Sequence, residues 1–226
     1  SCDMGALPIV FSGYQPVSND ETRAKFEKAW GVTLPSTPGL TIVETLNAAH
    51  DGKINALYIM GENPMLSDPD LTHAKEALQK LDLLVVQDIV LSETARLAHV
   101  VLPATSFAEK DGTFTNTERR VQRIRKVVNA PGEAKADWKI ISELATKMGY
   151  PMNYSSPEDI MQEVNALTPS YAGITYDRIE KVGLQWPCPN TSHPGTKILH
   201  TEKFTRGLGL FSPIEFKPPA EVPDKD

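Results

Sequence analysis

The sequence of 226 residues lacks long apolar runs and has no excess of basic residues. Its apolar runs are short, such as those at 83–86 and 99–102, whereas a membrane helix needs roughly 18 consecutive apolar residues. No membrane span is therefore expected. Lys and Arg number 23 against 29 Asp and Glu, which gives a formal net charge of -6. Because this balance offers no basic field to a phosphate backbone, nucleic acid is not an expected partner, and a small ligand fits better.

Sulfur ligands and the usual catalytic motifs are also scarce. The two cysteines, Cys2 and Cys188, form neither a metal-binding pair nor a disulfide framework, which favours a reducing, cytoplasmic location. The five histidines show no spacing typical of a zinc site or of a base beside a nucleophile. No phosphate-binding loop with Gly-Lys-Ser/Thr and no Gly-x-Ser-x-Gly elbow occurs. A self-sufficient active site is therefore not expected, and neither are metal ligands.

Regular alternation of helix and strand is what the sequence does contain. Between residues 40 and 102, apolar strands are separated by amphipathic helices. Short apolar strands with helices of this length between them predict an α/β fold: a doubly wound, mostly parallel sheet flanked by helices. The predicted helices are 42–50, 70–81 and 92–98, and the predicted strands are 56–60, 83–86 and 100–102.

The remaining segments predict a less regular organisation. We expect residues 1–130 to form an α/β dinucleotide-binding-like domain and residues 131–226 to form an irregular helical segment without a second sheet. The proline-rich last fourteen residues resemble a linker, and both ends of the chain are expected to be cut from a longer protein. Further expected features are helices at 21–30, 137–148, 157–167 with Ser156 as N-cap, and 176–182, a turn at Asp111-Gly112, and a strand at 120–128.

Polar segments follow each of the three predicted parallel strands. They are Gly61-Glu62-Asn63-Pro64, Gln87-Asp88 and Pro103-Ala104-Thr105-Ser106. In an open parallel sheet, ligands bind outside the carboxyl ends of the strands. Asp88 could accept paired N–H bonds from a guanine-like edge, while hydroxyl groups or backbone N–H groups could contact phosphate. The three loops therefore predict a nucleotide pocket.

Purely structural roles for these and neighbouring residues remain as alternatives to ligand binding. Gly-x-Asn-Pro is a common turn, and Ser67-Asp68-Pro69 is typical of a turn followed by a helix start. Asp137 can act as a helix cap or first-turn acid instead of a ligand group. The basic cluster of Arg119, Arg120, Arg123, Arg125 and Lys126 can hold an anionic cofactor or partner, or can form a solvated face.

Several motifs together resemble the molybdopterin-dependent oxidoreductases. They are Ala56-Leu57-Tyr58-Ile59-Met60-Gly61-Glu62-Asn63-Pro64, Val85-Val86-Gln87-Asp88-Ile89, Val100-Val101-Leu102-Pro103-Ala104-Thr105, Glu109-Lys110-Asp111-Gly112-Thr113-Phe114-Thr115-Asn116 and Arg119-Arg120-Val121-Gln122. Within that family the chain is most similar to the catalytic alpha subunit of formate dehydrogenase. That similarity is carried by Gly13-Tyr14-Gln15-Pro16, Asp137-Trp138-Lys139-Ile140-Ile141 and Gln185-Trp186-Pro187-Cys188.

The resemblance implies oxidation of formate to carbon dioxide, or the reverse, at molybdenum or tungsten held by molybdopterin guanine dinucleotide. It also implies a 4Fe-4S cluster, the remaining parts of the catalytic subunit, and iron–sulfur electron-transfer subunits as partners. Ala104 stands where the family can carry a hydroxyl residue. The implied cofactor-binding residues are Gly61, Glu62, Asn63, Ser67, Gln87, Asp88, Thr105 and Asp137.

Other family features do not occur in this sequence. The cluster cysteines, the metal-ligating cysteine or selenocysteine with its histidine, and the catalytic arginine have no counterpart here, and the C-terminal barrel would begin after Asp226. The chain therefore resembles an internal fragment without activity of its own. A cofactor-free scaffold, like a region of the respiratory NADH dehydrogenase large subunit, and another molybdopterin enzyme, such as nitrate reductase, remain as alternatives. The polar groups at 62–63, 87–88 and 137 favour the first reading.

Overall fold

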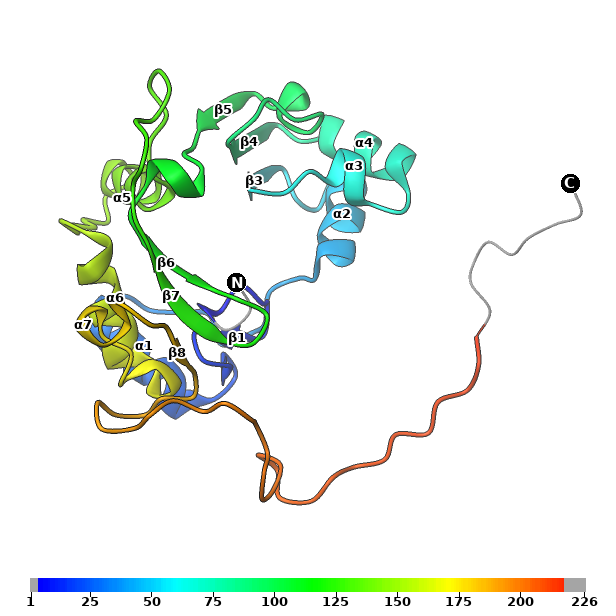
Figure 1. Cartoon of the computed structure of the whole chain (residues 1–226). Helices are drawn as coiled ribbons and strands as arrows, with labels where there is room; N and C mark the ends of the chain where they lie inside the picture. Colours follow the sequence, from blue (N-terminus) through cyan, green and yellow to red (C-terminus); the bar gives the residue numbers. More distant parts are fainter. Residues whose placement is uncertain (1–3, 218–226) are drawn as a thin grey trace, which may run out of the picture. The chain divides into compact units, whose positions relative to one another are not determined.

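The computed structural model describes residues 4–217, which fall into two units with the division after Thr196. The first unit holds every helix and strand assigned among these residues (Figure 1). In the second unit, Phe204 and Gly207 form an isolated bridge, and large apolar side chains such as Phe211, 97% exposed, project from the chain. Most of the predicted linker-like tail, residues 218–226, lies outside the described residues.

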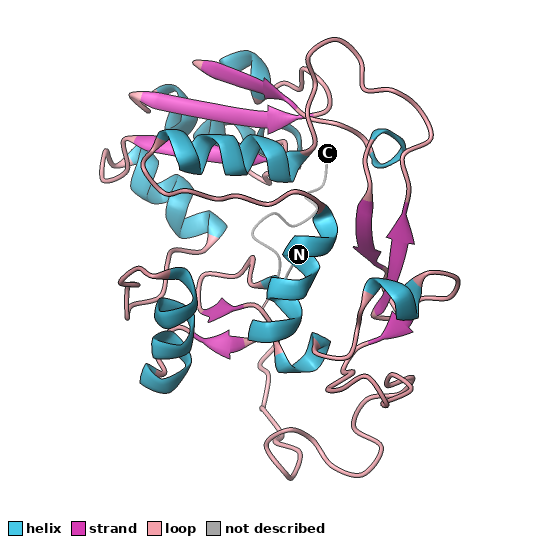
Figure 2. Ribbon diagram, turned by 90° about the vertical axis from the view of Figure 1, so that its left-hand side faces the viewer, coloured by secondary structure: helices cyan, strands magenta, loops and turns pink. Residues whose placement is uncertain are grey.

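A parallel sheet of three strands organises the first half of the chain. Strands β3 (Ala56–Met60), β4 (Leu83–Asp88) and β5 (Val100–Pro103) lie in the order β3-β4-β5. Their register pairs Tyr58 with Val85 and Val85 with Val100. Figure 2 shows these strands side by side with helices packed against them. The predicted α/β class with a parallel sheet and flanking helices is confirmed.

Helices α2 (Ile42–His50) and α4 (Leu71–Gln79) cover one face of this sheet. Thr41 and Glu44 form a capping box at the start of α2, and the Asp70 side chain accepts from the backbone N–H of His73 at the start of α4. These bonds satisfy N–H groups that have no partner within the helix. Small residues on the buried side of the helices allow close packing on the strands; the buried cluster is Leu46, Ala49, Ala74, Ala77, Leu78, Leu81, Leu84, Val86 and Ala95.

The opposite face of the parallel sheet is only partly covered. Tyr58, Met60, Leu83 and Val100 are 38%, 47%, 43% and 43% exposed. The strand register places them on the side away from α2 and α4, because side chains alternate along a strand. Parallel sheets normally have both faces covered. This chain therefore leaves part of an apolar sheet face open.

The remaining elements include those that form a second core. An antiparallel sheet joins β6 (Gly112–Thr115), β7 (Arg120–Ile124) and β8 (Leu184–Gln185), and a small one joins β1 (Val10–Phe11) and β2 (Gln15–Pro16). The helices are α1 (Asp20–Trp30), α3 (Pro64–Ser67), α5 (Asp137–Lys147), α6 (Pro157–Leu167) and α7 (Tyr176–Ile179), with 3-10 turns at Ala95–Leu97, Phe107–Glu109 and Pro169–Tyr171. The second core contains Val121, Met161, Tyr171, Ile174, Tyr176, Ile179 and Cys188.

Several local predictions are wrong. The segment 131–226, expected to contain no sheet strand, contributes β8, which pairs with β7; a Cβ on Gly183 would lie 2.5 Å from the carbonyl oxygen of Val121, so glycine permits this approach. No turn is assigned at Asp111-Gly112; Asp111 precedes β6, which begins at Gly112. The predicted strand at 120–128 ends at Ile124, since the N–H groups of Val127 and Val128 bond the carbonyl of Ala108.

Two short helices also differ from prediction. The segment expected to be helical over 92–98 forms only the 3-10 turn Ala95–Leu97, and the helix expected over 176–182 ends at Ile179. Both segments are too short for helix periodicity to be distinguished from a single turn. The predicted domain boundary near residue 130 stays a prediction.

Candidate functional site at the carboxyl edge of the parallel sheet

The three predicted loops lie next to one another. The N–H of Gly61 donates to the carbonyl of Gln87 at 2.9 Å, and the N–H of Ala104 donates to the carbonyl of Asp88 at 2.9 Å. These bonds continue the parallel register beyond the strands, so the loops after β3, β4 and β5 share one edge. Gly61 has φ +65°, a left-handed conformation that side chains rarely adopt. The chain can therefore turn away sharply after β3.

The Asn63 side chain joins the loop after β3 to residues 93 and 94 by hydrogen bonds. Its Oδ1 accepts from the hydroxyl of Thr94 at 2.8 Å and from its N–H at 3.2 Å, while its Nδ2 donates to Glu93 at 2.7 Å. The bond from Asn63 holds the pKa of Glu93 below its ordinary value. The hydroxyl of Ser67 donates to the backbone carbonyl of Asn63 at 3.2 Å. Asn63 and Ser67 therefore hold the loop after β3, whereas Glu62 is exposed.

A partly buried network connects the sheet to α5. Gln87 is 0% exposed; its Oε1 accepts from the Tyr58 hydroxyl, and its Nε2 donates to Asp137 Oδ1 at 2.8 Å. Lys110 forms an ion pair with the other oxygen of Asp137 and donates to the Thr105 carbonyl at 2.9 Å. Burial, and next the charge of Asp137, raise the pKa of Tyr58. Asp137 is thus neutralised by a cation inside the protein.

Asp88 and Thr105 retain unused hydrogen-bonding capacity. Asp88 is half-buried, and its Oδ1 accepts from the N–H of Ile89 at 2.6 Å. No described residue donates to its second oxygen. Thr105 is 2% exposed, and its hydroxyl is buried without a partner among the described residues. Because buried polar groups are normally bonded, this orphaned hydroxyl fits a site that gains a polar ligand atom.

The structure thus brings the predicted residues to one edge but gives them different surroundings. Asp137 is the first helical residue of α5, and Ala136 occupies the N-cap position, so Asp137 is a first-turn acid and not a cap. Tyr58, Thr94 and Lys110 were not predicted. Strand periodicity places Tyr58 on the same face as Gln87 and could have identified it, whereas no local signal marks Thr94 or Lys110.

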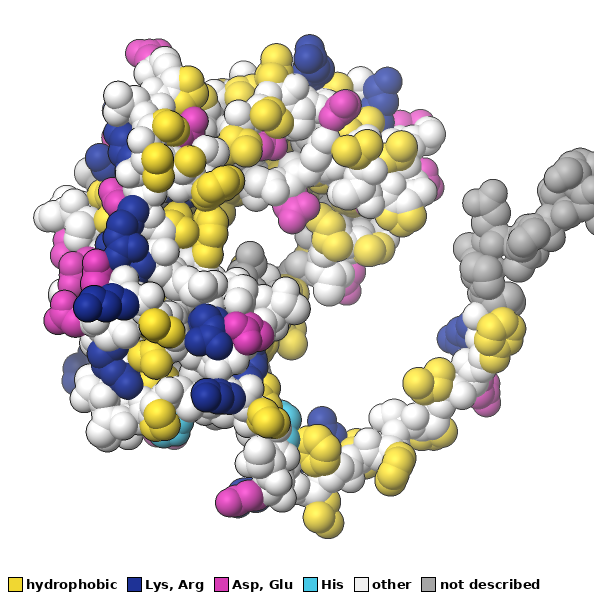
Figure 3. All heavy atoms as spheres, viewed as in Figure 1, with side chains coloured by type: hydrophobic (Ala, Val, Ile, Leu, Met, Phe, Trp, Pro, Cys, Tyr) yellow, Lys and Arg dark blue, Asp and Glu magenta, His cyan; other side chains and the backbone are white. Residues whose placement is uncertain are grey.

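The basic cluster is largely occupied within the protein. Arg120 pairs with Glu118 at 2.7 Å, and Arg125 pairs with Glu180 at 2.6 Å. Arg123 lies 3.9 Å from the ring centroid of Tyr176. On the face drawn in Figure 3, Lys and Arg side chains are interspersed with Asp and Glu. A structural, partly solvated role accounts for these arginines.

Neither a membrane-spanning helix nor a metal-binding cluster occurs among residues 4–217. None of the helices in this range combines the length and apolar character of a membrane span. No grouping of three or more His, Cys, Asp or Glu side chains in the same range has the geometry to hold a metal ion.

Comparisons with a family model and with individual proteins agree on the family of this chain. A family model described as molybdopterin oxidoreductase matches residues 1–147. The chain is 56% identical to the F420-dependent formate dehydrogenase subunit alpha of Methanocaldococcus jannaschii, covering 100% of this chain and 34% of that protein. It is 45% identical to formate dehydrogenase H of Escherichia coli, covering 93% of this chain and 30% of that protein. The chain therefore spans about a third of the length of these relatives.

One solved structure has a similar fold. Acetylene hydratase from Pelobacter acetylenicus matches with a TM-score of 0.55 and 20% sequence identity, over 80% of this chain and 25% of that chain. At this identity the likeness concerns the fold alone.

Proposed function

Because the chain belongs to the molybdopterin oxidoreductase family, we propose that it forms part of the catalytic subunit of a formate dehydrogenase. The complete subunit would oxidise formate to carbon dioxide or catalyse the reverse reaction. The relatives named formate dehydrogenase support this activity, and each is matched over nearly the whole length of this chain. The low cysteine content supports a cytoplasmic location.

We further propose that the carboxyl edge of the parallel sheet binds a molybdopterin guanine dinucleotide. When bound, this group would carry the molybdenum or tungsten that exchanges electrons with formate. The 4Fe-4S cluster would be held by polypeptide outside this chain, and iron–sulfur subunits would be its electron-transfer partners. The observation that carries the proposal is the single edge formed by the loops at 61–63, 87–88 and 104–105.

Individual residues would have distinct roles. The free oxygen of Asp88 would accept N–H groups of the guanine edge, Gly61 would allow close approach of the backbone, and the Thr105 hydroxyl would gain its missing partner. Glu62 would contact the ligand from the exposed loop. Asn63 and Ser67 would hold that loop, while Gln87 and Asp137, with Lys110, would fix the floor of the site.

The open sheet face supports a role within a larger subunit. Its half-exposed apolar side chains, including Tyr58 and Leu83, form a surface that other parts of the subunit would cover. The alternative of a cofactor-free scaffold explains this face equally well. It does not explain the unpaired oxygen of Asp88 or the orphaned Thr105 hydroxyl, which favour a ligand. Another molybdopterin reductase, such as a nitrate reductase, is a further alternative, and substrate assays distinguish it.

Replacing Asp88 tests the cofactor role. In the complete subunit, Asp88→Ala should lower retention of the pterin cofactor roughly tenfold to a hundredfold, because a hydrogen bond to a charged group contributes about 1.5–3 kcal/mol. Pterin and metal content after purification would be measured at equal amounts of folded protein. Asp82→Ala, an exposed carboxylate before the same strand, is the matched control. Cofactor content unchanged in Asp88→Ala would remove this role.

A further inference from the structure

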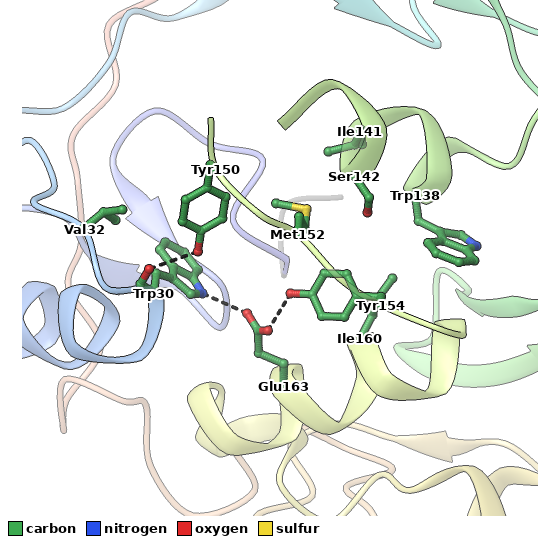
Figure 4. A pocket seen from close by; sticks show the side chains of 10 residues that line it. All are labelled: Trp30, Val32, Trp138, Ile141, Ser142, Tyr150, Met152, Tyr154, Ile160 and Glu163. Carbon is green, nitrogen blue, oxygen red and sulfur yellow. Dashed lines mark hydrogen bonds between the residues drawn. The ribbon is translucent and has the colours of Figure 1, made fainter. Parts of the chain in front are cut away.

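A pocket separate from the carboxyl edge lies among α1, α5, α6 and the segment 150–154 (Figure 4). Its volume is about 570 Å³, and none of the predicted cofactor-binding residues lines it. Four aromatic side chains form much of the wall: Trp30, Trp138, Tyr150 and Tyr154. The volume and apolar lining are typical of a site for a small organic molecule.

Glu163 is the one ionisable carboxylate in this lining, and it has unusual partners. Its two oxygens accept from the indole N–H of Trp30 at 2.8 Å and from the hydroxyl of Tyr154 at 2.5 Å. Both donors are neutral. Among the described residues, no ion pair involves Glu163. This half-buried carboxylate in an aromatic pocket therefore has no cationic partner among the described residues.

The phenol of Tyr154 is held in its neutral form. Burial, and next the hydrogen bond and charge of Glu163, raise the pKa of Tyr154 well above its ordinary value. Tyr154 is thus a donor that orients the carboxylate without compensating its charge. The hydroxyl of Tyr150 donates to the backbone carbonyl of Trp30 at 3.0 Å, which fixes a second ring at the same end of the pocket.

Ser142 supplies an independent sign of a ligand. It comes from α5, on the opposite wall from Glu163, and Figure 4 shows its hydroxyl pointing toward the side where Met152 and Tyr154 lie. The residue is 7% exposed, and its hydroxyl has no hydrogen-bond partner among the described residues. A buried hydroxyl without a partner is uncommon. This one belongs to a residue of the pocket wall.

We propose that this pocket binds a small organic cation that carries a substituted ammonium group. The ammonium group contacts the aromatic faces and the Glu163 carboxylate, and a polar atom of the same molecule bonds the Ser142 hydroxyl. Aromatic faces attract such cations through the negative charge of their π systems, and the uncompensated carboxylate adds a direct ionic attraction in a poorly solvated place. A free molecule fits better than one lysine or arginine side chain, because the volume matches a whole small ligand.

Choline and its uncharged isostere 3,3-dimethylbutanol test the proposal. Titration calorimetry on the complete polypeptide that carries this chain should show binding of choline and binding at least roughly tenfold weaker for the isostere. Glu163→Gln should abolish most of this difference while leaving weak binding of the isostere. Absence of choline binding, which includes the case in which another segment or subunit already fills the pocket, would overturn the proposal.

Two further variants separate the ionic contact from general effects. Glu158→Gln removes the same charge from an exposed position on the same helix and should leave choline binding unchanged. Trp138→Ala removes an aromatic wall without touching the partners of Glu163 and should weaken choline more than the isostere. If Glu163→Gln fails to fold, Trp138→Ala provides the test by itself. An equal loss of affinity for choline and for the isostere in this variant would contradict the cation site. Neither result depends on the pterin cofactor, so this test is independent of the function proposed above.

Discussion

Asp137 and Glu163 are two half-buried carboxylates that each accept from two side-chain donors. They differ in whether one of those donors carries a positive charge. Asp137 receives a neutral amide from Gln87 and a cation from Lys110. Glu163 receives two neutral donors, from Trp30 and Tyr154. The charge of Asp137 is therefore paired with a cation of the same chain. Glu163 has no such partner among the described residues and can attract a cation from outside the chain. The two carboxylates have the same number of donors, so only the charge of the donors distinguishes their surroundings.

The largest effect on stability is expected from breaking the hydrogen-bond network of Gln87 with Tyr58 and Asp137. Gln87→Leu removes a fully buried amide that bonds both Tyr58 and Asp137. We expect the free energy of unfolding to fall by about 1–3 kcal/mol, because both hydrogen bonds of the buried amide are lost and two polar groups lose a partner. Chemical denaturation would measure this change. Gln122→Leu, at an exposed position of β7, should change stability by less than about 0.5 kcal/mol. Equal effects of the two variants would refute the assigned role of Gln87.

An intermediate effect is expected at alkaline pH in the aromatic pocket. The pKa of Tyr154 is raised in the folded state above its ordinary value of 10.0. The folded state therefore binds this proton more tightly than the unfolded state, so the stabilising contribution is complete below about pH 10 and is lost as pH rises toward the folded pKa. Tyr58 and Tyr176 have pKa values shifted the same way and contribute part of the same decline.

Tyr154→Phe isolates this contribution. Thermal unfolding measured from about pH 8 to about pH 11 should show a shallower alkaline decline for this variant than for the unsubstituted chain. The variant also leaves Glu163 with the indole of Trp30 as its partner. A decline of the same steepness in both proteins would show that Glu163 and burial do not act on this phenol.

The smallest effect is expected from Ser142→Ala. This substitution removes a buried hydroxyl that has no partner among the described residues. Stability should stay unchanged or rise by up to about 1 kcal/mol, since no hydrogen bond is lost and an unsatisfied group is removed. The exposed Ser36→Ala serves as reference for denaturation measurements. A clear loss of stability in Ser142→Ala, without a loss in Ser36→Ala, would contradict the assignment of the Ser142 hydroxyl as unpartnered.

The predicted and observed elements agree best where the signal is local. The helix at 42–50 and the strand at 56–60 have the observed bounds, and Ser156 is the N-cap of α6. Strands β6 and β8 were not predicted, because each is short and acquires its conformation from pairing with β7. Strand formation of this kind depends on residues distant in the sequence, as between Val121 and Leu184.

The same distinction applies to the two sites. Loops after three apolar strands could be identified from the sequence, since parallel strands bring their carboxyl ends to one edge. The partners of individual residues could not, because Gln87 and Asp137 are 50 positions apart along the chain and no local pattern links them. The aromatic pocket was not predicted at all, because its residues come from four segments without a common motif.

The sequence by itself determined the α/β alternation, the caps of several helices and the polar strand ends, because these features depend on neighbours within a few residues. Only the tertiary structure decided that Lys110 neutralises Asp137 while Glu163 has no cation among the described residues. That distinction depends on distances between side chains carried by separate elements. Hydrogen-bond partners and charge compensation in a folded chain are set by those distances, and residue type and spacing do not specify them.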